Sequence, residues 1–421
     1  MDYKFLPAAD SEVHELIKKE ERRQASGLEL IASENYASSA VLEAMASVFQ
    51  NKYSEGYIGR RYYAGNEVVD EIETLAIERA KKLFGANFVN VQALSGSPAN
   101  LAVYFALINP GDKVLGLKLD HGGHLSHGHP INFTGKTYDF VQFGCNPETG
   151  RIEMDEVEKL AREHQPKMIV AGFSAYSRDF DWVRFRKIAD EVGALAFADI
   201  AHIAGLIAGK QIAGPIEAGF DVVTTTTHKT LRGPRGALIF SKNEEIAKKI
   251  NRAVFPGIQG GPHEHVIAAI AVALGEALQP EFAEYSKQVI VNSKKLAAEL
   301  ISRGFEIVSG GTDNHLMVVD LQNKNVGGRE FTAALDCAGI SASASTIPND
   351  PNPPMKPSGI RFGTPAITTR GMREAEMEKI AEWISQVAER WEDSEKLTAI
   401  KKEVGELAAQ FPVPGIQTWS T

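Results

Sequence analysis

Hydrophobic and polar positions along the chain form two kinds of pattern: short continuous apolar runs, and segments with helical spacing. Short apolar runs, typical of buried strands, recur at 88–91, 113–117, 167–172, 195–199, 222–227 and 237–241. Helical spacing lies between several of these runs, as at 69–84 and 182–192. Strands that are buried on both faces are continuously apolar, and helices connect the strands of a parallel sheet. The pattern therefore predicts an α/β domain with a largely parallel sheet.

The rest of the chain has different patterns. A helical period begins at Asp10 or Ser11, both good N-caps, and runs to about Ala25. Residues 31–66 then form a glycine- and tyrosine-rich stretch, and loops of this length are usually functional or disordered. Helices from about residue 265 lead into a second pattern of alternating strands and helices. We predict an N-terminal arm and active-site loop at 1–66, a large domain at 67–280 and a small domain at 281–421.

Composition narrows the class of protein. The 421 residues are 43% hydrophobic and 24% charged, which is typical of a soluble globular protein. A net charge of −9 argues against a general nucleic-acid surface. Two cysteines are too few for a disulfide scaffold or a cysteine-rich zinc site. The N-terminal residues do not form an apolar signal segment, and we expect no membrane span and a cytoplasmic location.

A lysine follows the most polar of the predicted strands. The run 222–227 is followed directly by His228 and Lys229, and then by a turn rich in glycine and proline. An amine placed there suits a desolvated nucleophile, which forms Schiff bases with pyridoxal phosphate or with carbonyl substrates. A lone lysine would more often be a surface residue, but its neighbours favour chemistry here.

Asp199 ends the strand at 195–199, one strand–helix–strand unit before the lysine. A carboxylate at the carboxyl edge of a parallel sheet faces the crevice in which such sheets bind ligands. It could keep a cofactor's pyridinium nitrogen protonated, or it could only cap the strand. The spacing to Lys229 favours the first interpretation.

Two glycine-containing segments are further candidates. Residues 95–97, Ser-Gly-Ser, precede an apolar helix whose free N–H groups would bind a phosphate, although a simple helix cap is the alternative. Pro98 suits the first helical position. The segment from His121 to His129 holds four histidines among glycines. Without a nearby carboxylate or cysteine set, a ring stacked on a flat cofactor is favoured over a metal site.

Two isolated charges complete the candidates. Arg361 lies on a short apolar strand between glycines, where its guanidinium could clamp the α-carboxylate of an amino acid or form a structural ion pair. Glu55 lies in a loop of tyrosines and is either a proton shuttle or a solvated glutamate.

These residues lie in motifs that resemble one family. The motifs are LIASENY (30–36), NKYSEGY (51–57), RRYYAG (60–65), HGGHLSHG (121–128), TTTTHKTLRGPRG (224–236), VFPGIQGGP (254–262), SGGTDNH (309–315) and GIRFGTPA (359–366). In order, and over about residues 12–410, they resemble serine hydroxymethyltransferases. The resemblance implies a fold-type-I pyridoxal phosphate enzyme with an N-terminal arm, a large seven-stranded, mostly parallel α/β domain and a smaller C-terminal α/β domain. It also implies a homodimer, sometimes a pair of dimers, with sites built from both subunits.

The implied reaction is reversible: L-serine and tetrahydrofolate give glycine, 5,10-methylenetetrahydrofolate and water. By resemblance, Lys229 carries pyridoxal 5'-phosphate covalently, while Thr226 and His228 tune its exchange. The other cofactor residues are Asp199 at the pyridinium nitrogen, His124 on the ring, Ser174 and His202 near the phenolic oxygen, Ser95, Gly96 and Ser97 at the phosphate, and the neighbouring subunit's copies of Tyr53, Gly260 and Gly261. Arg361 and Ser33 hold the substrate carboxylate, and Glu55 and Tyr63 contact the substrate and handle protons. Folate lies along Leu119, Gly123, His124, Leu125 and Ser345.

Two positions depart from the family pattern. Many members have Gln where this chain has Pro98, and residues 343–345 are Ser-Ala-Ser in place of an Asn-Lys-Asn stretch near the folate. The second departure leaves open a folate-independent β-hydroxy amino acid aldolase or transaldolase on the same scaffold. A non-catalytic protein that binds pyridoxal phosphate is a further alternative, which the presence of Lys229, Asp199, Arg361 and Glu55 disfavours.

Overall fold

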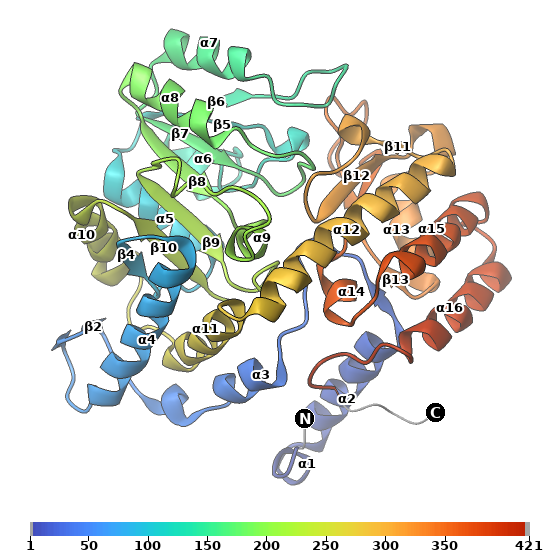
Figure 1. Cartoon of the computed structure of the whole chain (residues 1–421), viewed down its shortest axis with the longest axis horizontal. Helices are drawn as coiled ribbons and strands as arrows, with labels where there is room; N and C mark the ends of the chain where they lie inside the picture. Colours follow the sequence, from blue (N-terminus) through green and yellow to red (C-terminus); the bar gives the residue numbers. More distant parts are fainter. Residues whose placement is uncertain (1–2, 417–421) are drawn as a thin grey trace. The chain divides into compact units, whose positions relative to one another are not determined.

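The computed structural model describes residues 3–416 (Figure 1). The chain divides into two compact units. Ala40–Lys287 form the central unit, and the described residues before Ala40 and after Lys287 form the terminal unit. The three-domain division at residues 66 and 280 stays a prediction.

A seven-stranded sheet forms the centre of the central unit, as the family resemblance implied. Its order is β4 (Phe88–Asn90), β10 (Ala237–Ser241), β9 (Val222–Thr226), β8 (Leu195–Asp199), β7 (Met168–Gly172), β5 (Lys113–Leu117) and β6 (Asp139–Phe143). Strands β9 to β6 pair in parallel, whereas β10 is antiparallel to both of its neighbours. The predicted α/β class with a mostly parallel sheet is confirmed.

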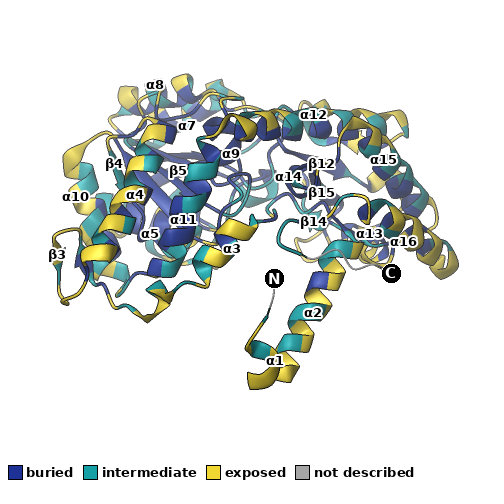
Figure 2. Cartoon of the chain, turned by 60° about the horizontal axis from the view of Figure 1, so that its bottom comes forward, coloured by how far each residue is buried: buried dark blue, intermediate teal, exposed yellow. Residues whose placement is uncertain are grey.

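Helices surround this sheet. They are α4 (Glu67–Phe84), α5 (Gly96–Leu107), α6 (Phe133–Thr137), α7 (Met154–His164), α8 (Trp182–Val192), α9 (Ala204–Ala208), α10 (Glu244–Arg252) and α11 (Glu264–Ala277). The strands are almost wholly buried, whereas α4 and α10 each expose one side to solvent (Figure 2). Tyr104 of α5 packs against Phe197 of β8 in the core, with ring centroids 5.6 Å apart. This packing fixes α5 against the sheet and so places its N-terminus.

The glycine- and tyrosine-rich stretch contains short elements. They are α3 (Ser39–Met45), the 3₁₀ turn η1 (Val48–Asn51) and the two-stranded hairpin of β2 (Gly56–Tyr57) and β3 (Arg60–Arg61). A further 3₁₀ turn, η2 (Leu119–His121), and a π-helical segment, η3 (Ala253–Ile258), lie next to candidate site residues.

One local prediction is wrong. Helix α5 begins at Gly96 with Ser95 as its N-cap, so Pro98 is the third helical residue and not the first. The first turn of a helix has no internal partners for its N–H groups, and a proline is tolerated there because it lacks one.

The terminal unit contains a four-stranded antiparallel sheet in the order β11 (Glu306–Ile307), β12 (Leu316–Asp320), β15 (Gly359–Gly363) and β14 (Ser343–Ser345). A separate parallel pair joins β1 (Leu28–Glu29) to β13 (Ile340–Ser341). Its other elements are α1 (Leu6–Ala9), α2 (Ser11–Ser26), η4 (Val308–Gly310), η5 (Gln322–Lys324), α13 (Gly328–Cys337), α14 (Pro365–Thr369), α15 (Glu374–Glu389) and α16 (Ser394–Ala408). Helix α12 (Pro280–Ser302) runs across the division between the units.

Two further sequence expectations concern helices. Asp10 is the N-cap of α2, as predicted, and its Oδ1 accepts a hydrogen bond of 3.0 Å from the N–H of Val13. Within residues 3–416, no single helix is long and apolar enough to cross a membrane, although the pair α11 and α12, bent by 83°, passes that test jointly by length and composition.

Candidate active site

Asp199 lies at the carboxyl end of β8, in the middle of the large sheet, and is 9% exposed. Its Oδ2 accepts hydrogen bonds from Asn100 Nδ2 at 2.7 Å and from His127 Nε2 at 3.1 Å. Its Oδ1 accepts a third, of 3.0 Å, from the N–H of Ala201. Burial raises the pKa of Asp199, but the hydrogen bond and charge of His127 outweigh burial, so the pKa lies below its ordinary value. The structure therefore holds an ionised carboxylate in a buried place.

His124 lies beside this carboxylate. Its ring centroid is 5.6 Å from that of His127, and its Nδ1 lies 2.6 Å from Ser126 Oγ. Burial, followed by the neighbouring His127, lowers the pKa of His124 to about 4. The imidazole is therefore neutral at physiological pH.

Ligand atoms of His124, His127 and Asp199 lie within 4.8 Å of one another, a spacing that a metal ion could use. However, His127 and Asp199 already bond directly to each other. The expectation of a site without metal stays a prediction.

Lys229 lies just beyond β9, after Thr227 and His228, near the strand end that the sequence pattern indicated. Its positive charge contributes to the lowered pKa values of Asp199 and of His124, so the lysine lies within electrostatic range of both. Next to it, burial lowers the pKa of His228 to about 3, with a smaller contribution from Arg235. The structure thus brings together the lysine, the aspartate and the histidine ring that the sequence singled out.

Strand β9 also meets the start of α5. A Cβ atom added to Gly96 would lie 2.7 Å from Thr226 Cγ2, so only glycine fits at the closest approach of the two elements. Ser95 caps the helix with extended backbone, and its side chain makes no capping hydrogen bond. The first N–H groups of α5, with the hydroxyls of Ser95 and Ser97, therefore suit an anion.

The other candidates of the central unit lie in loops at the strand ends. The N–H of Ser174 donates to the oxygen of Gly122 at 2.7 Å, which joins the loop after β7 to the segment with Leu119, Gly123 and Leu125. Gly123 lies so close to the oxygen of Leu117 that a Cβ atom would approach it to 2.3 Å. His202 is 3% exposed, and its ring stacks on Phe173 with centroids 6.3 Å apart.

A second set of candidates gathers around the tyrosine-rich loop. The rings of Tyr53 and Tyr63 meet edge to face with centroids 5.2 Å apart. A Cβ atom on Gly260 would lie 3.2 Å from Glu55 Oε1, and one on Gly261 would lie 3.4 Å from the Tyr53 ring. The charge of Glu55 raises the pKa of Tyr63. The structure therefore brings all five of these candidates together.

The terminal unit holds the remaining candidates. Arg361 is the central residue of β15, and burial lowers its pKa to about 10. Two residues later the N–H of Gly363 donates to the oxygen of Leu30 at 2.8 Å, which brings the segment containing Ser33 to the end of the same strand. Ser345 pairs with Gly359, and its Oγ donates to the oxygen of Thr346 at 3.0 Å.

Comparison with known proteins decides the family. The model of the family described as "Serine hydroxymethyltransferase" matches residues 6–384. The chain belongs to the serine hydroxymethyltransferase family. It is 56% identical over 409 residues to the serine hydroxymethyltransferase of Acinetobacter baylyi, covering 97% of this chain and 98% of that protein. The protein of the same name from Legionella pneumophila (strain Lens) is 56% identical, over 96% of this chain and 97% of that protein. The one from Acidothermus cellulolyticus is 54% identical, over 98% of this chain and 97% of that protein.

A serine hydroxymethyltransferase is a pyridoxal-phosphate-dependent transferase of fold type I, and the central unit fits that cofactor. Asp199 supplies an ionised carboxylate at the carboxyl edge of the sheet, where a ring cation would bind. The start of α5 approaches β9 so closely that only glycine is tolerated. Nδ1 of His228 is buried with no hydrogen-bond partner among the described residues. Buried polar atoms usually have a partner, so this nitrogen is available to form a hydrogen bond with a bound group.

Sequence reasoning missed both side chains that hold Asp199. Asn100 lies 99 residues and His127 lies 72 residues from it along the chain. His127 was one of four histidines in its segment, and Asn100 was an ordinary polar position in an apolar helix. An amide on the sheet-facing side of a predicted core helix was the available signal, because a buried amide requires a partner.

Proposed function

We propose that this chain catalyses the reversible transfer of a hydroxymethyl group from L-serine to tetrahydrofolate, giving glycine, 5,10-methylenetetrahydrofolate and water. One structural observation carries the proposal: a buried, ionised Asp199 lies within electrostatic range of Lys229 at the carboxyl edge of a parallel sheet. The names of relatives that are 54–56% identical over nearly the whole chain support it and favour it over the aldolase and non-catalytic alternatives.

In this proposal, Lys229 holds pyridoxal 5'-phosphate covalently. Ser95, Gly96 and Ser97 bind the phosphate at the start of α5, together with the partner subunit's Tyr53, the partner subunit's Gly260 and the partner subunit's Gly261. When bound, the cofactor supplies an electron sink for cleavage of the bond between Cα and Cβ of serine. Ser174 and His202 lie around its phenolic oxygen, and Thr226 and His228 tune its exchange with the substrate.

The charges of the site suit this chemistry. The lowered pKa of Asp199 keeps its carboxylate negative. The carboxylate can therefore accept a hydrogen bond from a protonated ring nitrogen and stabilise its positive charge. The lowered pKa values of His124 and His228 keep both imidazoles neutral, so neither repels a protonated ring. His124 can therefore stack on the cofactor without a charge penalty.

The substrates are held by other side chains. Arg361 clamps the carboxylate of serine with its planar guanidinium, and Ser33 adds a hydroxyl. Glu55 is the group that exchanges protons with the substrate hydroxyl, with Tyr63 beside it. Tetrahydrofolate lies along Leu119, Gly123, His124, Leu125 and Ser345.

We also propose a homodimer, with a pair of dimers as the larger form. The tyrosine-rich loop carries several large side chains that a single chain leaves in solvent, and contiguous exposed apolar groups mark interaction surfaces. They are Val48 (81% exposed), Tyr53 (56%), Tyr62 (74%) and Tyr63 (48%). The partners of the protein are then itself, serine, glycine and tetrahydrofolate, and not nucleic acid. We propose a cytoplasmic location, which suits two free cysteines, Cys145 and Cys337.

Serine turnover with and without tetrahydrofolate tests the function. A hydroxymethyltransferase converts serine rapidly only when tetrahydrofolate is present. A folate-independent aldolase converts serine or another β-hydroxy amino acid at the same rate with and without tetrahydrofolate. Absence of turnover of any such substrate in cofactor-loaded protein would instead support the non-catalytic alternative.

A further inference from the structure

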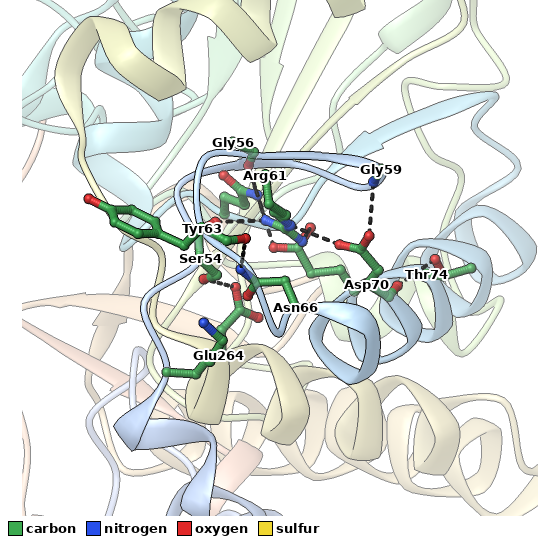
Figure 3. A network of polar contacts seen from close by, with 12 residues as sticks. Ser54, Gly56, Gly59, Arg61, Tyr63, Asn66, Asp70, Thr74 and Glu264 are labelled. Atoms are coloured by element: carbon green, nitrogen blue, oxygen red, sulfur yellow. Dashed lines mark hydrogen bonds and ion pairs between the residues drawn. The ribbon is translucent and has the colours of Figure 1, made fainter.

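The loop that carries Glu55 is exposed at its tip and fixed at its base. Tyr62 is 74% exposed, whereas Ser54, directly before Glu55, is wholly buried. The side chain of Arg61, from the far strand of the same loop, reaches the backbone on both sides of Glu55 (Figure 3). Gln92, from outside the loop, reaches the backbone after Glu55. The position of Glu55 therefore depends on what holds its two neighbours.

Arg61 and Gln92 hold the backbone. Arg61 Nη1 donates to the oxygen of Ser54 at 2.8 Å and to the oxygen of Gly56 at 3.0 Å. Gln92 Nε2 donates to the same oxygen of Gly56 at 3.0 Å. Ser54 is also fixed by its side chain, because its Oγ donates to Oε1 of Glu264 at 2.6 Å (Figure 3).

The charges beneath the loop do not balance. Arg61 forms ion pairs with Asp70 at 2.8 Å and with Glu73 at 2.9 Å. Glu264 adds a third carboxyl group, within hydrogen-bonding reach of Glu73, and both glutamates are 1% exposed. One guanidinium cannot neutralise three carboxylates, and two buried carboxylates in contact cannot both remain ionised.

The hydrogen bonds show which group carries the compensating proton. Glu73 is ion-paired with Nη2 of Arg61 and accepts a hydrogen bond of 2.9 Å from Gln92 Nε2. Glu264 accepts from Ser54 through Oε1, but its Oε2 is buried and has no donor among the residues that the structure describes. A proton on Oε2 turns this orphaned acceptor into a donor to Glu73 and removes the repulsion.

We propose that Glu264 is a positioning residue: its carboxyl group keeps a proton on Oε2, donates it to Glu73, and thereby holds Ser54 and the loop that presents Glu55. The assignment of a proton-transfer role to Glu55 rests on the proposed function. The fixation of the loop rests on the contacts alone.

Burial, followed by the charge of Glu73, raises the pKa of Glu264 to about 8, and burial raises the pKa of Glu73 as well. The charged groups that act on Glu264 are Glu73 of α4 and Arg61 of β3. Other titratable groups on the neighbouring elements are Asp70, paired with Arg61, Arg79, bonded to the oxygen of Ala271, Tyr57 of β2, and His263 and His265 at the same end of α11. A raised pKa means that the contribution of Glu264 is fully present below its ordinary value of 4.5 and is lost as pH rises through about 8. The loop should therefore loosen in mildly alkaline solution.

Hydrogen exchange of the cofactor-free, full-length protein tests the proposal. Exchange of residues 53–63 is measured from about pH 6 to about pH 9, corrected for intrinsic rates, with helix α8 as an internal reference. In the wild-type protein, protection of the loop should fall roughly tenfold relative to α8 as pH rises through about 8.

Two substitutions sharpen the result. Glu264→Gln keeps an acceptor for Ser54 and a donor for Glu73 without a titrating charge, so its loop should stay protected at high pH. Glu264→Ala removes both bonds, so its loop should exchange fast at every pH. Glu276→Gln, at the other end of α11, is the matched control and should behave as wild type. Equal pH dependence in the wild type and Glu264→Gln, or a Gln variant as unprotected as Ala near neutral pH, would overturn the proposal.

A second readout separates this proposal from the proposed function. In the cofactor-loaded enzyme, the fall of kcat on the alkaline side should begin at higher pH in Glu264→Gln than in the wild type, and an unshifted profile in an active enzyme would contradict the role in placing Glu55. If the wild type lacks hydroxymethyltransferase activity, the proposed function fails, while the exchange experiment still decides whether Glu264 fixes the loop.

Discussion

Replacement of Asp199 by asparagine should weaken cofactor binding while leaving the fold intact. The two side chains have the same shape, but the substitution removes the negative charge that three donors surround in the free protein. A ring nitrogen that carries a proton then loses a charge-assisted hydrogen bond in a buried place. Such bonds contribute about 1.5–3 kcal/mol, which corresponds to about 10- to 150-fold in the dissociation constant.

The same substitution should lower turnover further, because a neutral amide cannot hold the ring nitrogen protonated. Equilibrium titration of the cofactor-free protein with pyridoxal phosphate measures the affinity, and serine turnover at saturating cofactor measures the remaining activity. Asp221→Asn is the matched control, since Asp221 precedes β9 at the opposite edge of the same sheet and pairs with Arg186 at 2.6 Å. An Asp199→Asn protein with affinity within about threefold of wild type would refute the assignment of Asp199 to the ring nitrogen.

Further substitutions test three separate parts of the site. Lys229→Gln should abolish multiple turnovers and borohydride trapping of the cofactor on the chain while retaining some cofactor binding; rapid turnover would contradict the covalent role. Arg361→Ala should weaken serine binding about 10- to 150-fold with little change in cofactor affinity. Arg361→Lys keeps the charge without the planar fork, so its serine affinity should lie between those of the wild type and Arg361→Ala. If Arg361→Ala weakened serine binding less than about threefold, the carboxylate clamp would lie elsewhere. Replacing residues 343–345 by Asn-Lys-Asn should strengthen tetrahydrofolate binding a few-fold to about a hundredfold, since each restored hydrogen bond contributes about 0.5–1.5 kcal/mol, whereas an unchanged folate constant would mean that the departure is compensated.

The sequence predicted several buried elements together with their bounds. Strands β5, β8 and β10 and helix α8 have the bounds that the apolar runs indicated. Strand β6 was not predicted, because its sequence DFVQF is only partly buried and carries polar residues at two positions. A half-buried strand gives neither a continuous apolar run nor a clean alternation, so its existence depends on its pairing with β5.

The candidate site was predictable where its residues follow strands. Lys229 and Asp199 stand at the carboxyl ends of neighbouring parallel strands, and parallel pairing brings such ends to one edge. The supports of Asp199 were not predictable in this way. His127 and Asn100 lie 72 and 99 residues away, and only the tertiary fold determines which polar groups meet there.

The buried acids beneath the Glu55 loop show what a helical pattern does reveal. Glu73 falls on the same face of α4 as Val69, Ala76 and Ala80, all of which are buried. An acid is rarely buried unless it is paired, so a glutamate at a core-facing position predicts a partner that the helix itself does not supply. Here the partners are Arg61 and Glu264, which come from the loop and from the facing helix α11.

Such a network fixes one geometry more sharply than apolar contacts would. Apolar groups tolerate small shifts, whereas each buried donor or acceptor that loses its partner costs about 1–3 kcal/mol. Because the loop is bonded to Asp70 through Arg61, to Gln92 through Gly56 and to Glu264 through Ser54, a displacement of the loop would break several of these bonds at once. A loop without a hydrophobic core within its own chain can therefore present Glu55 in one position, provided that the proton on Glu264 is retained.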